Sequence, residues 1–299
     1  MRVLVTGAGG FLGGAIYRRL AGRNDIETIS AGRPELGAPP AALAMLALCK
    51  PDVVVHAAGR THGPKPAFYV DNVLSTEILA KAIGAAAPRC ALVLLGSAAQ
   101  YGPSPDRVAW RESGPCDPLD AYGASKVFAE ESAFEEAKRS GIRVTSLRIF
   151  NVISPEPHGQ QAYPDFLRKL AAAMSAPSPW RVEMGDLSAV RDFVSLDDVL
   201  QAVDRVIERG AWGEAINVCT GVGRPVRNLL DDVSRAVADA APGVVEIFER
   251  GPPPGLDWSI GDPAKCQAQL GFTPSSDLSA LTAAAAAWVR KAATERADA

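Results

Sequence analysis

A tyrosine and a lysine stand four residues apart in the stretch DAYGASK, residues 120–126. In an α-helix, positions i and i+4 lie on the same face, so the phenol of Tyr122 and the ammonium of Lys126 can serve one site. A free tyrosine titrates near pH 10, and a neighbouring positive charge lowers that pKa by favouring the phenolate. Such a pair can act as a general acid-base, in which Tyr122 moves the proton and Lys126 tunes it. The alternative is a surface helix with a tyrosine near its start.

A serine hydroxyl precedes this pair in the sequence. The run ALVLLGS at residues 91–97 has the composition of a buried strand, and Ser97 ends it. Ligands of open α/β sheets bind outside the carboxyl ends of the strands. We therefore expect Ser97 to hydrogen-bond a substrate carbonyl or alcohol in the same crevice as Tyr122.

A glycine-rich stretch, TGAGGFLGG at residues 6–14, follows the first expected strand and opens the first expected helix. Gly7, Gly10 and Gly13 are spaced as GxxGxxG, whereas the stricter GxGxxG fingerprint would need a glycine in place of Leu12. Glycines at such a turn let a pyrophosphate approach the helix N-terminus, where free N–H groups and the helix dipole favour anions. The strand-loop-helix context predicts a dinucleotide-binding loop, with a merely tight turn as the alternative.

The end of the second expected strand bears on the choice of cofactor. NAD enzymes place an acid there for the ribose 2′-hydroxyl, whereas a nearby arginine accommodates the 2′-phosphate of NADP. Here the strand ends in ISAGRPE, with Ser30 and Arg33 and no acid before Glu35. NADP(H) is therefore favoured over NAD(H), and the alternative for Arg33 is a solvated loop charge.

The elements that must position these residues alternate along the chain between strands and helices. Short apolar runs bounded by turn residues predict strands, and helix-length segments stand between them. Such an alternation predicts a parallel sheet covered on both faces, a Rossmann-type doubly wound α/β fold. The expected strands cover residues 3–7, 26–30, 52–59, 91–97 and 143–150, and expected helices include 11–21, 72–87 and 122–140.

The texture of the chain changes after Asn151, where prolines and glycines become frequent. This change predicts a smaller α/β substrate-binding C-terminal domain. Residues 1–151 are expected to form the dinucleotide-binding domain, with 187–221 returning to it. The substrate-binding domain is then expected to comprise 152–186 and 222–299.

Bulk properties favour small-molecule chemistry. The chain has 299 residues, 47% of them hydrophobic, and a formal net charge of −3, so its charge gives no case for nucleic acid or an anionic membrane as partner. The opening MRVLVTG runs straight into a strand pattern without signal-peptide features, and a cytoplasmic location is expected. The five cysteines stand singly, which predicts reduced structural thiols and no metal site.

The motifs together resemble the extended short-chain dehydrogenase/reductase family, of the NAD-dependent epimerase/dehydratase type. The resemblance rests on the glycine loop, HAAG at 56–59, Asn72, Ser97 and the YxxxK spacing, and it covers nearly the whole chain. It implies that Ser97, Tyr122 and Lys126 form a catalytic triad, with Lys126 also bonding the nicotinamide ribose. It further implies that HAAG passes the adenosine and ribose side of the cofactor, with no catalytic role expected for its histidine.

The later half looks most like the GDP-4-keto-6-deoxymannose reductase branch of that family. LRIFNVISP and MGDLSAVRDFVSLDDV resemble the segments whose asparagine and arginine, here Asn151 and Arg191, meet a nucleotide-sugar diphosphate. A guanidinium suits phosphate because its donors form a rigid fork, although a local salt bridge between Arg191 and Asp192 is the alternative. The sequence departs from the pattern in GPPPGLD, where a second arginine is common and only Arg250, just upstream, could substitute. It departs again at Gln100 and Ser154.

The expected contacts can be collected by ligand. The expected cofactor contacts are Gly7, Gly10, Phe11, Leu12, Gly13, Ser30, Arg33, Ala57, Ala58, Gly59, Asn72, Tyr122 and Lys126. The expected substrate contacts are Ser97, Ala98, Asn151, Arg191 and Arg250.

Three activities share this family's scaffold. A 4,6-dehydratase usually carries an Asp-Glu pair beside its strand-end hydroxyl, where this chain has two alanines after Ser97. A 4-epimerase tends to have the acid that is missing after the second strand. The resemblance therefore favours NADPH-dependent reduction of a nucleotide-linked 4-keto-6-deoxyhexose, with an NAD-dependent 4-epimerase second and a non-catalytic NADP-binding regulator as a remote third. It also implies a homodimer formed through the helices after Asn72 and Tyr122.

Overall fold

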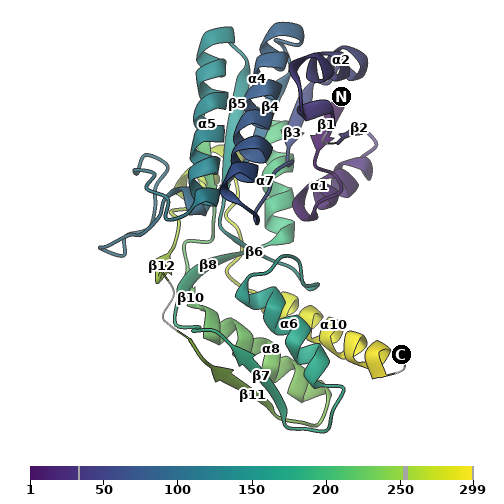
Figure 1. Ribbon diagram of the computed structural model, residues 1–299, viewed down its shortest axis with the longest axis vertical. Coiled ribbons are helices and arrows are strands. Elements are labelled where there is room, and N and C mark those ends of the chain that lie inside the picture. Colours follow the sequence, from purple (N-terminus) through teal and green to yellow (C-terminus); the bar gives the residue numbers. More distant parts are fainter. Residues whose placement is uncertain (33, 252–254, 298–299) are drawn as a thin grey trace.

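The computed structural model describes residues 1–32, 34–251 and 255–297. Its larger part is a six-stranded parallel sheet with helices on both faces (Figure 1). β-Branched and leucine residues fill these strands because both faces of the sheet are buried. The strands are β1 (Arg2–Thr6), β2 (Glu27–Ala31), β3 (Val53–His56), β4 (Ala91–Ser97), β5 (Arg143–Ile149) and β9 (Ala215–Val218).

Side chains of alternate strand residues enter two separate cores. Val3 and Val5 of β1 pack in the core under one helical layer, whereas Leu4 packs in the core under the other. The first layer contains α1 (Phe11–Ala21), α7 (Leu196–Arg209) and α9 (Ala264–Leu270). The second contains α2 (Pro39–Cys49), α4 (Ser75–Ala86) and α5 (Ala121–Ser140).

The order of the strands is β2-β1-β3-β4-β5-β9, and every neighbouring pair is parallel. The chain leaves β1 for β2 on one side and later returns to β3 on the other side. The sheet therefore has its topological switch point between β1 and β3, where such folds bind their ligands. The expected doubly wound α/β fold is confirmed.

Short elements connect these strands and helices at the same end of the sheet. Two of them flank the crevice: a π-helix, η2 (Tyr69–Leu74), leads into α4, and a 3-10 turn, η3 (Ala98–Gln100), follows β4 directly. The remaining short elements are η1 (Pro34–Leu36) and α3 (Lys65–Phe68).

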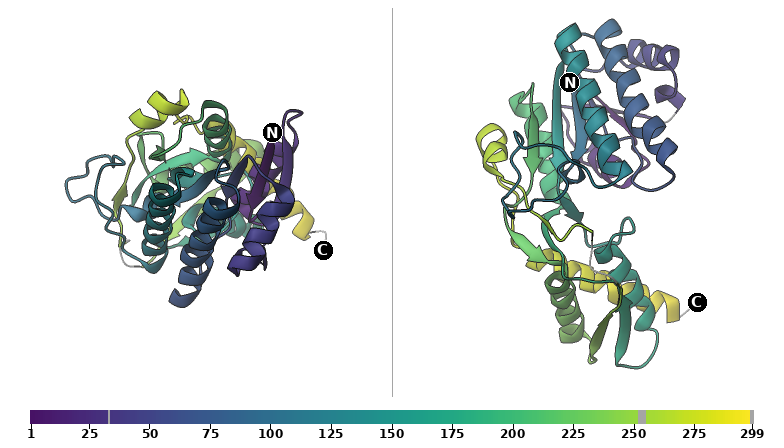
Figure 2. Two further views of the ribbon diagram at one scale, coloured as in Figure 1. Left: turned by 90° about the horizontal axis from the view of Figure 1, so that it is seen from above. Right: turned by 60° about the vertical axis from the view of Figure 1, so that its left-hand side comes forward.

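A smaller part hangs below the large sheet and contains the C-terminal helix (Figures 1 and 2). Its own core lies between three helices and two small sheets. The helices are α6 (Ala162–Ala173), α8 (Val226–Ala240) and α10 (Ser279–Ala297). The strands are β6 (Asn151–Ile153), β7 (Trp180–Met184), β8 (Val190–Ser195), β10 (Gly223–Pro225), β11 (Val245–Glu249) and β12 (Trp258–Ser259).

The segment 187–221, which was expected to return to the dinucleotide-binding domain, is divided between the two parts. β8 pairs with β6, β10 and β12 in the smaller part. α7 and β9 lie in the larger part, where β9 forms the edge of the six-stranded sheet.

Three further features of the described residues concern membrane-spanning helices, metal sites and cysteines. None of their helices combines the length and the apolar character needed to cross a bilayer. Within the same described ranges, His, Cys, Asp and Glu side chains form no cluster able to hold a metal ion. The five cysteines are all free thiols, in agreement with expectation.

Candidate active site

The glycine loop turns sharply between β1 and α1. Gly7 has a φ of +70°, and a Cβ atom there would lie 2.6 Å from the backbone nitrogen of Ala58 on the neighbouring loop. Gly13 lies against the Gly7 carbonyl with no room for a side chain. Gly10 caps α1 without a side-chain acceptor, so no capping side chain occupies the first N–H groups of the helix, and such groups suit an anion. The backbone thus has the geometry expected of a phosphate loop.

A residue of the smaller part reaches this loop. The ring of His158, in the connection between β6 and α6, stacks on the ring of Phe11 with centroids 4.3 Å apart and an interplanar angle of 18°. Phe11 is the first residue of α1. The stack therefore joins the two parts of the molecule directly over the glycine loop.

His56 ends β3 as a buried, neutral side chain. Its Nδ1 lies 2.8 Å from Thr6 Oγ1 and its Nε2 lies 3.1 Å from Thr76 Oγ1. Because the Thr76 hydroxyl already donates to the Asn72 carbonyl, Nε2 carries the proton and Nδ1 accepts one from Thr6. Burial, with a smaller effect of Lys126, lowers the pKa of His56 to about 3. His56 fastens the HAAG loop to its neighbours, as a residue without a catalytic role would.

Asn72, expected among the cofactor contacts, makes its hydrogen bonds within the protein. Its Oδ1 accepts from the Arg60 backbone N–H at 2.6 Å, and its Nδ2 donates to the Arg60 carbonyl and to Ser125 Oγ at 3.0 and 2.8 Å. Ser125 in turn donates to the Tyr122 carbonyl at 2.7 Å. The π-helix that carries Asn72 thereby connects the HAAG loop to the first turn of α5.

Ser97 occupies the carboxyl end of β4 and caps the 3-10 turn that follows. Its hydroxyl accepts from the Ala99 N–H at 3.2 Å, and its own N–H donates to Gln100 Oε1 at 2.9 Å. This reciprocal capping box fixes the turn at the crevice. Ala98, an expected substrate contact, is the half-buried first residue of the same turn.

The structure at the start of α5 explains why a glycine, Gly123, follows Tyr122. Asp120 caps the helix, with Oδ1 accepting from the Gly123 N–H at 2.7 Å. A Cβ atom on Gly123 would collide with the Ala99 carbonyl and would lie 2.8 Å from Pro118 Cβ. Glycine therefore lets the helix approach the Ser97 turn closely, and Tyr122 hydrogen-bonds with Ser97.

Burial favours the neutral form of both members of the Tyr-Lys pair. It raises the pKa of Tyr122 above its ordinary value, and the hydrogen bond with Ser97 opposes this rise. It also lowers the pKa of Lys126 to about 8, and the charge of Glu130 opposes this fall. The lowering of the Tyr122 pKa that was expected from Lys126 is therefore wrong for the protein itself, where burial raises this pKa.

The expected diphosphate contacts lie on the small sheet. Asn151 Nδ2 donates to the Asp192 carbonyl at 2.9 Å, which orients the side chain at the start of β6. The half-buried Arg191 donates to the carbonyls of Val190 and Leu256 at 3.0 and 2.5 Å. The alternative of a salt bridge between Arg191 and Asp192 is wrong, because the buried Asp192 carboxylate accepts instead from the backbone and hydroxyl of Thr220 and from Gly221.

Two other expected contacts lie at the edges of the crevice. Arg250 follows β11, and its largely exposed guanidinium lies 3.5 Å from Glu183. Ser30, at the end of β2, is exposed. Arg33 lies outside the described residues. The first acid after β2, Glu35, turns back and accepts from the Gly32 N–H at 3.1 Å.

A buried ionic network beneath the catalytic candidates was not predicted. Arg148 of β5 donates from Nη2 to Glu130 of α5 at 2.5 Å and from Nη1 to the Tyr101 hydroxyl at 2.9 Å. The hydroxyl of Tyr101 then donates to Asn217 Oδ1 at 2.7 Å. A signal existed for one member, because Glu130 follows Lys126 at the same four-residue spacing that links Lys126 to Tyr122. Arg148 lies in β5, whose sequence RVTSLRI gave no sign of a partner for its charge.

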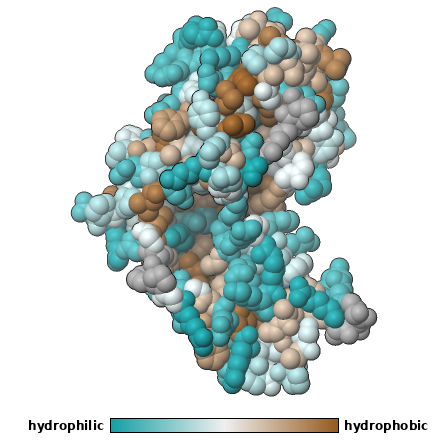
Figure 3. Space-filling view, viewed as in Figure 1, coloured by the Kyte–Doolittle hydropathy of each residue, from teal (hydrophilic) through white to brown (hydrophobic). Residues whose placement is uncertain are grey.

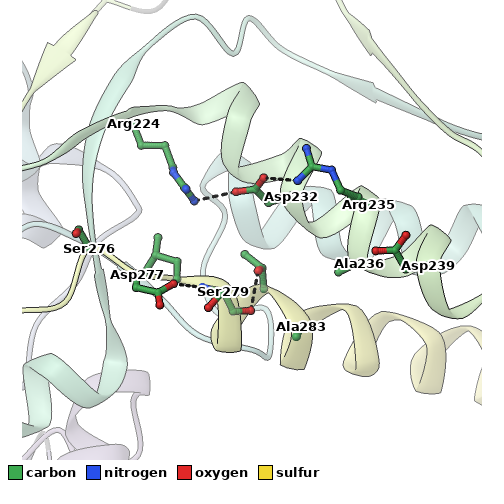
Figure 4. Close-up of a pocket in the computed structure, with 11 residues that line it drawn as sticks. Arg224, Asp232, Arg235, Ala236, Asp239, Ser276, Asp277, Ser279 and Ala283 are labelled. Atoms are coloured by element: carbon green, nitrogen blue, oxygen red, sulfur yellow. Dashed lines mark hydrogen bonds and ion pairs between the residues drawn. The ribbon is translucent and has the colours of Figure 1, made fainter.

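Two open pockets lie away from the catalytic candidates. One, of about 330 Å³ between α8 and the start of α10, is lined by Arg224, Arg235 and Asp277 among others, and Asp232 binds both arginines at 3.0 Å (Figure 4). The other, of about 600 Å³, lies under the loop around Trp110. The space-filling view shows a hollow where the two parts of the molecule meet (Figure 3).

The chain is similar to known proteins over most of its length. The model of the family described as NAD dependent epimerase/dehydratase matches residues 3–219. A dTDP-6-deoxy-L-talose 4-dehydrogenase (NAD(P)(+)) of Kitasatospora kifunensis is 30% identical over 296 residues, which cover 93% of this chain and 92% of that protein. A GDP-6-deoxy-D-mannose reductase of Pseudomonas aeruginosa is 30% identical over 205 residues, 67% of this chain and 66% of that protein. The structure of RMD from Pseudomonas aeruginosa complexed with NADPH has a TM-score of 0.83 and 26% identity, covering 97% of this chain and 99% of that one.

Proposed function

The chain belongs to the NAD-dependent epimerase/dehydratase family of nucleotide-sugar enzymes, and we propose that it reduces the 4-keto group of a nucleotide-linked 4-keto-6-deoxyhexose with NADPH. The observation that carries the proposal is the contact of Tyr122 with Ser97 at the carboxyl end of β4, one helical turn from Lys126. One relative is named as a 4-dehydrogenase of dTDP-6-deoxy-L-talose and the other as a GDP-6-deoxy-D-mannose reductase. Both names support redox chemistry on a nucleotide-linked 6-deoxy sugar.

The proposed mechanism divides the work between cofactor and protein. When bound, NADPH supplies the hydride. Ser97 and Tyr122 hydrogen-bond the carbonyl oxygen and stabilise the negative charge that develops on it. Tyr122, whose raised pKa keeps the phenol protonated in the protein, then gives its proton to that oxygen. Lys126 steadies the phenolate that remains, and it would also bond the nicotinamide ribose.

The substrate contacts belong to the same proposal. Arg191 carries its guanidinium into the small sheet without a carboxylate partner among the described residues, so its charge can serve a diphosphate. Asn151 lies on the neighbouring strand β6, where it pairs with Phe193, two residues along β8 from Arg191. Arg250 would contribute from the rim of β11. Ala98 would line the turn beside the sugar.

Replacement of one phenol by phenyl tests the reaction. Tyr122→Phe removes the proton donor, and we expect kcat to fall by about 10³-fold, within the range for loss of a general acid, while NADPH binding persists. The measurement is NADPH oxidation against GDP-, dTDP- and UDP-4-keto-6-deoxyhexoses. Tyr163→Phe is the matched control, because that buried hydroxyl in α6 has no hydrogen-bond partner. Substantial activity in Tyr122→Phe would sink the assignment.

The choice of NADPH rests on the end of β2. Glu35 is engaged with the Gly32 N–H, which leaves Ser30 and Arg33 to meet the ribose substituent. We expect Arg33→Ala to weaken NADPH binding at least tenfold more than NADH binding, by fluorescence titration of both cofactors. Equal losses for the two would remove the argument for a 2′-phosphate contact.

Two further observations would decide between the alternative functions. NAD retained through purification, visible in the absorbance of the protein, would favour the 4-epimerase. Turnover of any 4-keto sugar nucleotide would exclude the non-catalytic regulator.

A further inference from the structure

The connection between η3 and α5 reaches the smaller part of the molecule beside β12 (Figure 1). The Trp110 N–H donates to the Ile260 carbonyl at 2.9 Å, and the Asp262 N–H donates to the Trp110 carbonyl at 2.8 Å. The guanidinium of Arg111 also binds the Asp262 carboxylate at 2.8 Å. These contacts hold the connection against the residues that follow β12.

The tip of this connection, residues 104–108, is a closed turn that carries Arg107. The Ser104 hydroxyl bonds both the N–H and the carbonyl of Val108 at 3.0 Å, and the Arg107 N–H donates to the Ser104 carbonyl at 3.0 Å. Arg107 has a φ of +51°, in the left-handed region that residues other than glycine rarely adopt. Such a conformation costs free energy and is found preferentially at ligand-binding and catalytic sites. The backbone of Arg107 therefore points to a function for its side chain.

The guanidinium of Arg107 lies beside the residues that hold Arg191. Its Nη2 is 3.1 Å from Asp257 Oδ2, and Asp257 directly follows Leu256, whose carbonyl accepts Arg191 Nη2 at 2.5 Å. The Asp257 carbonyl accepts the Val190 N–H at 2.8 Å, which fixes it against β8. Burial lowers the pKa of Arg191, and the charge of Asp257 opposes this fall. Two consecutive residues thus bring together guanidiniums from two different elements.

Stability does not explain the contact between Arg107 and Asp257. Their side chains are 66% and 65% exposed, so water screens both charges. Exposed ion pairs of this kind contribute little to the free energy of unfolding. The contact instead places a positive charge at the surface beside Arg191.

The charges around Asp257 suit an anionic ligand. With two guanidiniums, of Arg107 and Arg191, and one carboxylate, the three side chains keep a net positive charge. The diphosphate of a nucleotide sugar is an anion, and the planar fork of a guanidinium matches phosphate oxygens. Arg224 lies directly opposite Arg191 on β10, but Asp232 holds its guanidinium at 3.0 Å. Arg107 has no such carboxylate on a helix and approaches from the side of the crevice.

We propose that Arg107 is a second arginine of the diphosphate site, so that the ligand is bound by Arg191 from the small sheet and by Arg107 from the connection above it. Because a guanidinium has five donors, Arg107 can hold Asp257 and phosphate oxygens at once. The inference deepens the proposed function and rests on it for the nature of the substrate.

The test measures binding of a nucleoside diphosphate to the full-length protein by calorimetry. GDP, dTDP and UDP are titrated into wild type, Arg107→Gln and Arg111→Gln. Arg111 is the matched control, because it belongs to the same connection, is 75% exposed and also forms an ion pair, but with Asp262 beyond β12. Thermal unfolding shows whether each variant folds as the wild type does.

We expect Arg107→Gln to raise the Kd of the diphosphate that the wild type binds most tightly by about tenfold, because a charge-assisted contact is lost. We expect Arg111→Gln to leave this Kd unchanged. Arg107→Lys keeps the charge without the fork and should give an intermediate Kd, which also tests the role if Arg107→Gln does not fold. In turnover, the KM for the sugar nucleotide should rise with kcat within about twofold of wild type, since Arg107 binds away from the reacting carbonyl.

The outcomes separate this inference from the proposed function. Equal Kd values for wild type and Arg107→Gln would overturn the role of Arg107 and leave the proposed reduction standing. Equal losses in Arg107→Gln and Arg111→Gln would also overturn it, because the connection as a whole would then matter and not its arginine. A wild-type protein that binds none of the three diphosphates would overturn both the inference and the substrate class on which it rests.

Discussion

At the scale of single residues, burial has a favourable effect on Tyr122 and an unfavourable effect on Lys126. Burial keeps the Tyr122 phenol protonated, as a proton donor must be, but the same burial weakens the positive charge of Lys126. A lysine with a lowered pKa is charged below that pKa and neutral above it. The pair therefore works within a pH window whose upper limit is set by Lys126.

That limit gives a prediction on pH dependence. With the pKa of Lys126 lowered to about 8, the charge that steadies the Tyr122 phenolate is present below pH 8 and lost as the pH rises past it. We expect kcat/KM for reduction to decline above pH 8. Lys126→Arg keeps its charge throughout this range, so the decline should disappear even if the overall rate is lower. A decline at the same pH in Lys126→Arg would assign it to another group.

Local spacing made part of the site predictable. Tyr122 and Lys126 stand at one helical repeat, and Ser97 directly follows an apolar run, so their meeting at one edge of the sheet needed only the α/β pattern. The Glu130–Arg148 contact joins residues 18 positions apart on different elements, and no periodicity reports it. The hydrogen bonds of Asp192 were equally unpredictable, because its partners Thr220 and Gly221 lie 28 and 29 positions further along the chain.

At the scale of elements, the periodic spacing of apolar residues predicted the strands and helices themselves. It did not predict how the elements near the site begin and end. The helix expected over 11–21 is found as α1. The helix expected over 72–87 instead begins as the π-helix η2 and becomes regular only at Ser75. The wider turn lets Asn72 reach Arg60 and Ser125 at once, a gain that depends on tertiary neighbours and not on local sequence.

The close approach of α5 to the Ser97 turn gives a prediction at this scale. Gly123→Ala inserts a methyl group against the Ala99 carbonyl and Pro118, so the helix must shift away from the turn. We expect the free energy of unfolding to fall by about 1–3 kcal/mol and kcat to fall at least tenfold, measured by urea denaturation and steady-state kinetics. Gly185→Ala is the control, because nothing lies within 4 Å of its added Cβ. Wild-type kcat in Gly123→Ala would show that the close approach is not needed for turnover.

At the scale of the whole molecule, α5 and η2 leave apolar side chains in solvent. Phe128 of α5 is 55% exposed, and Tyr69 and Val70 of the adjacent η2 are 56% and 53% exposed. The homodimer implied by the resemblance would use this region. We therefore predict that Phe128→Glu halves the mass measured by light scattering, whereas Leu48→Glu, at a leucine of α2 that is 83% exposed, does not. A wild-type protein that is already monomeric would contradict the prediction.

The ring stack of Phe11 on His158 has a consequence for the timing of catalysis. The proposed reductase would have to release its spent dinucleotide after every turnover, and the ring pair includes Phe11, which directly follows the glycine loop. His158 belongs to the part of the molecule that would hold the sugar. Departure of the dinucleotide then requires the two rings to separate, so we expect the sugar nucleotide to leave first and the dinucleotide last, giving an ordered sequence of release.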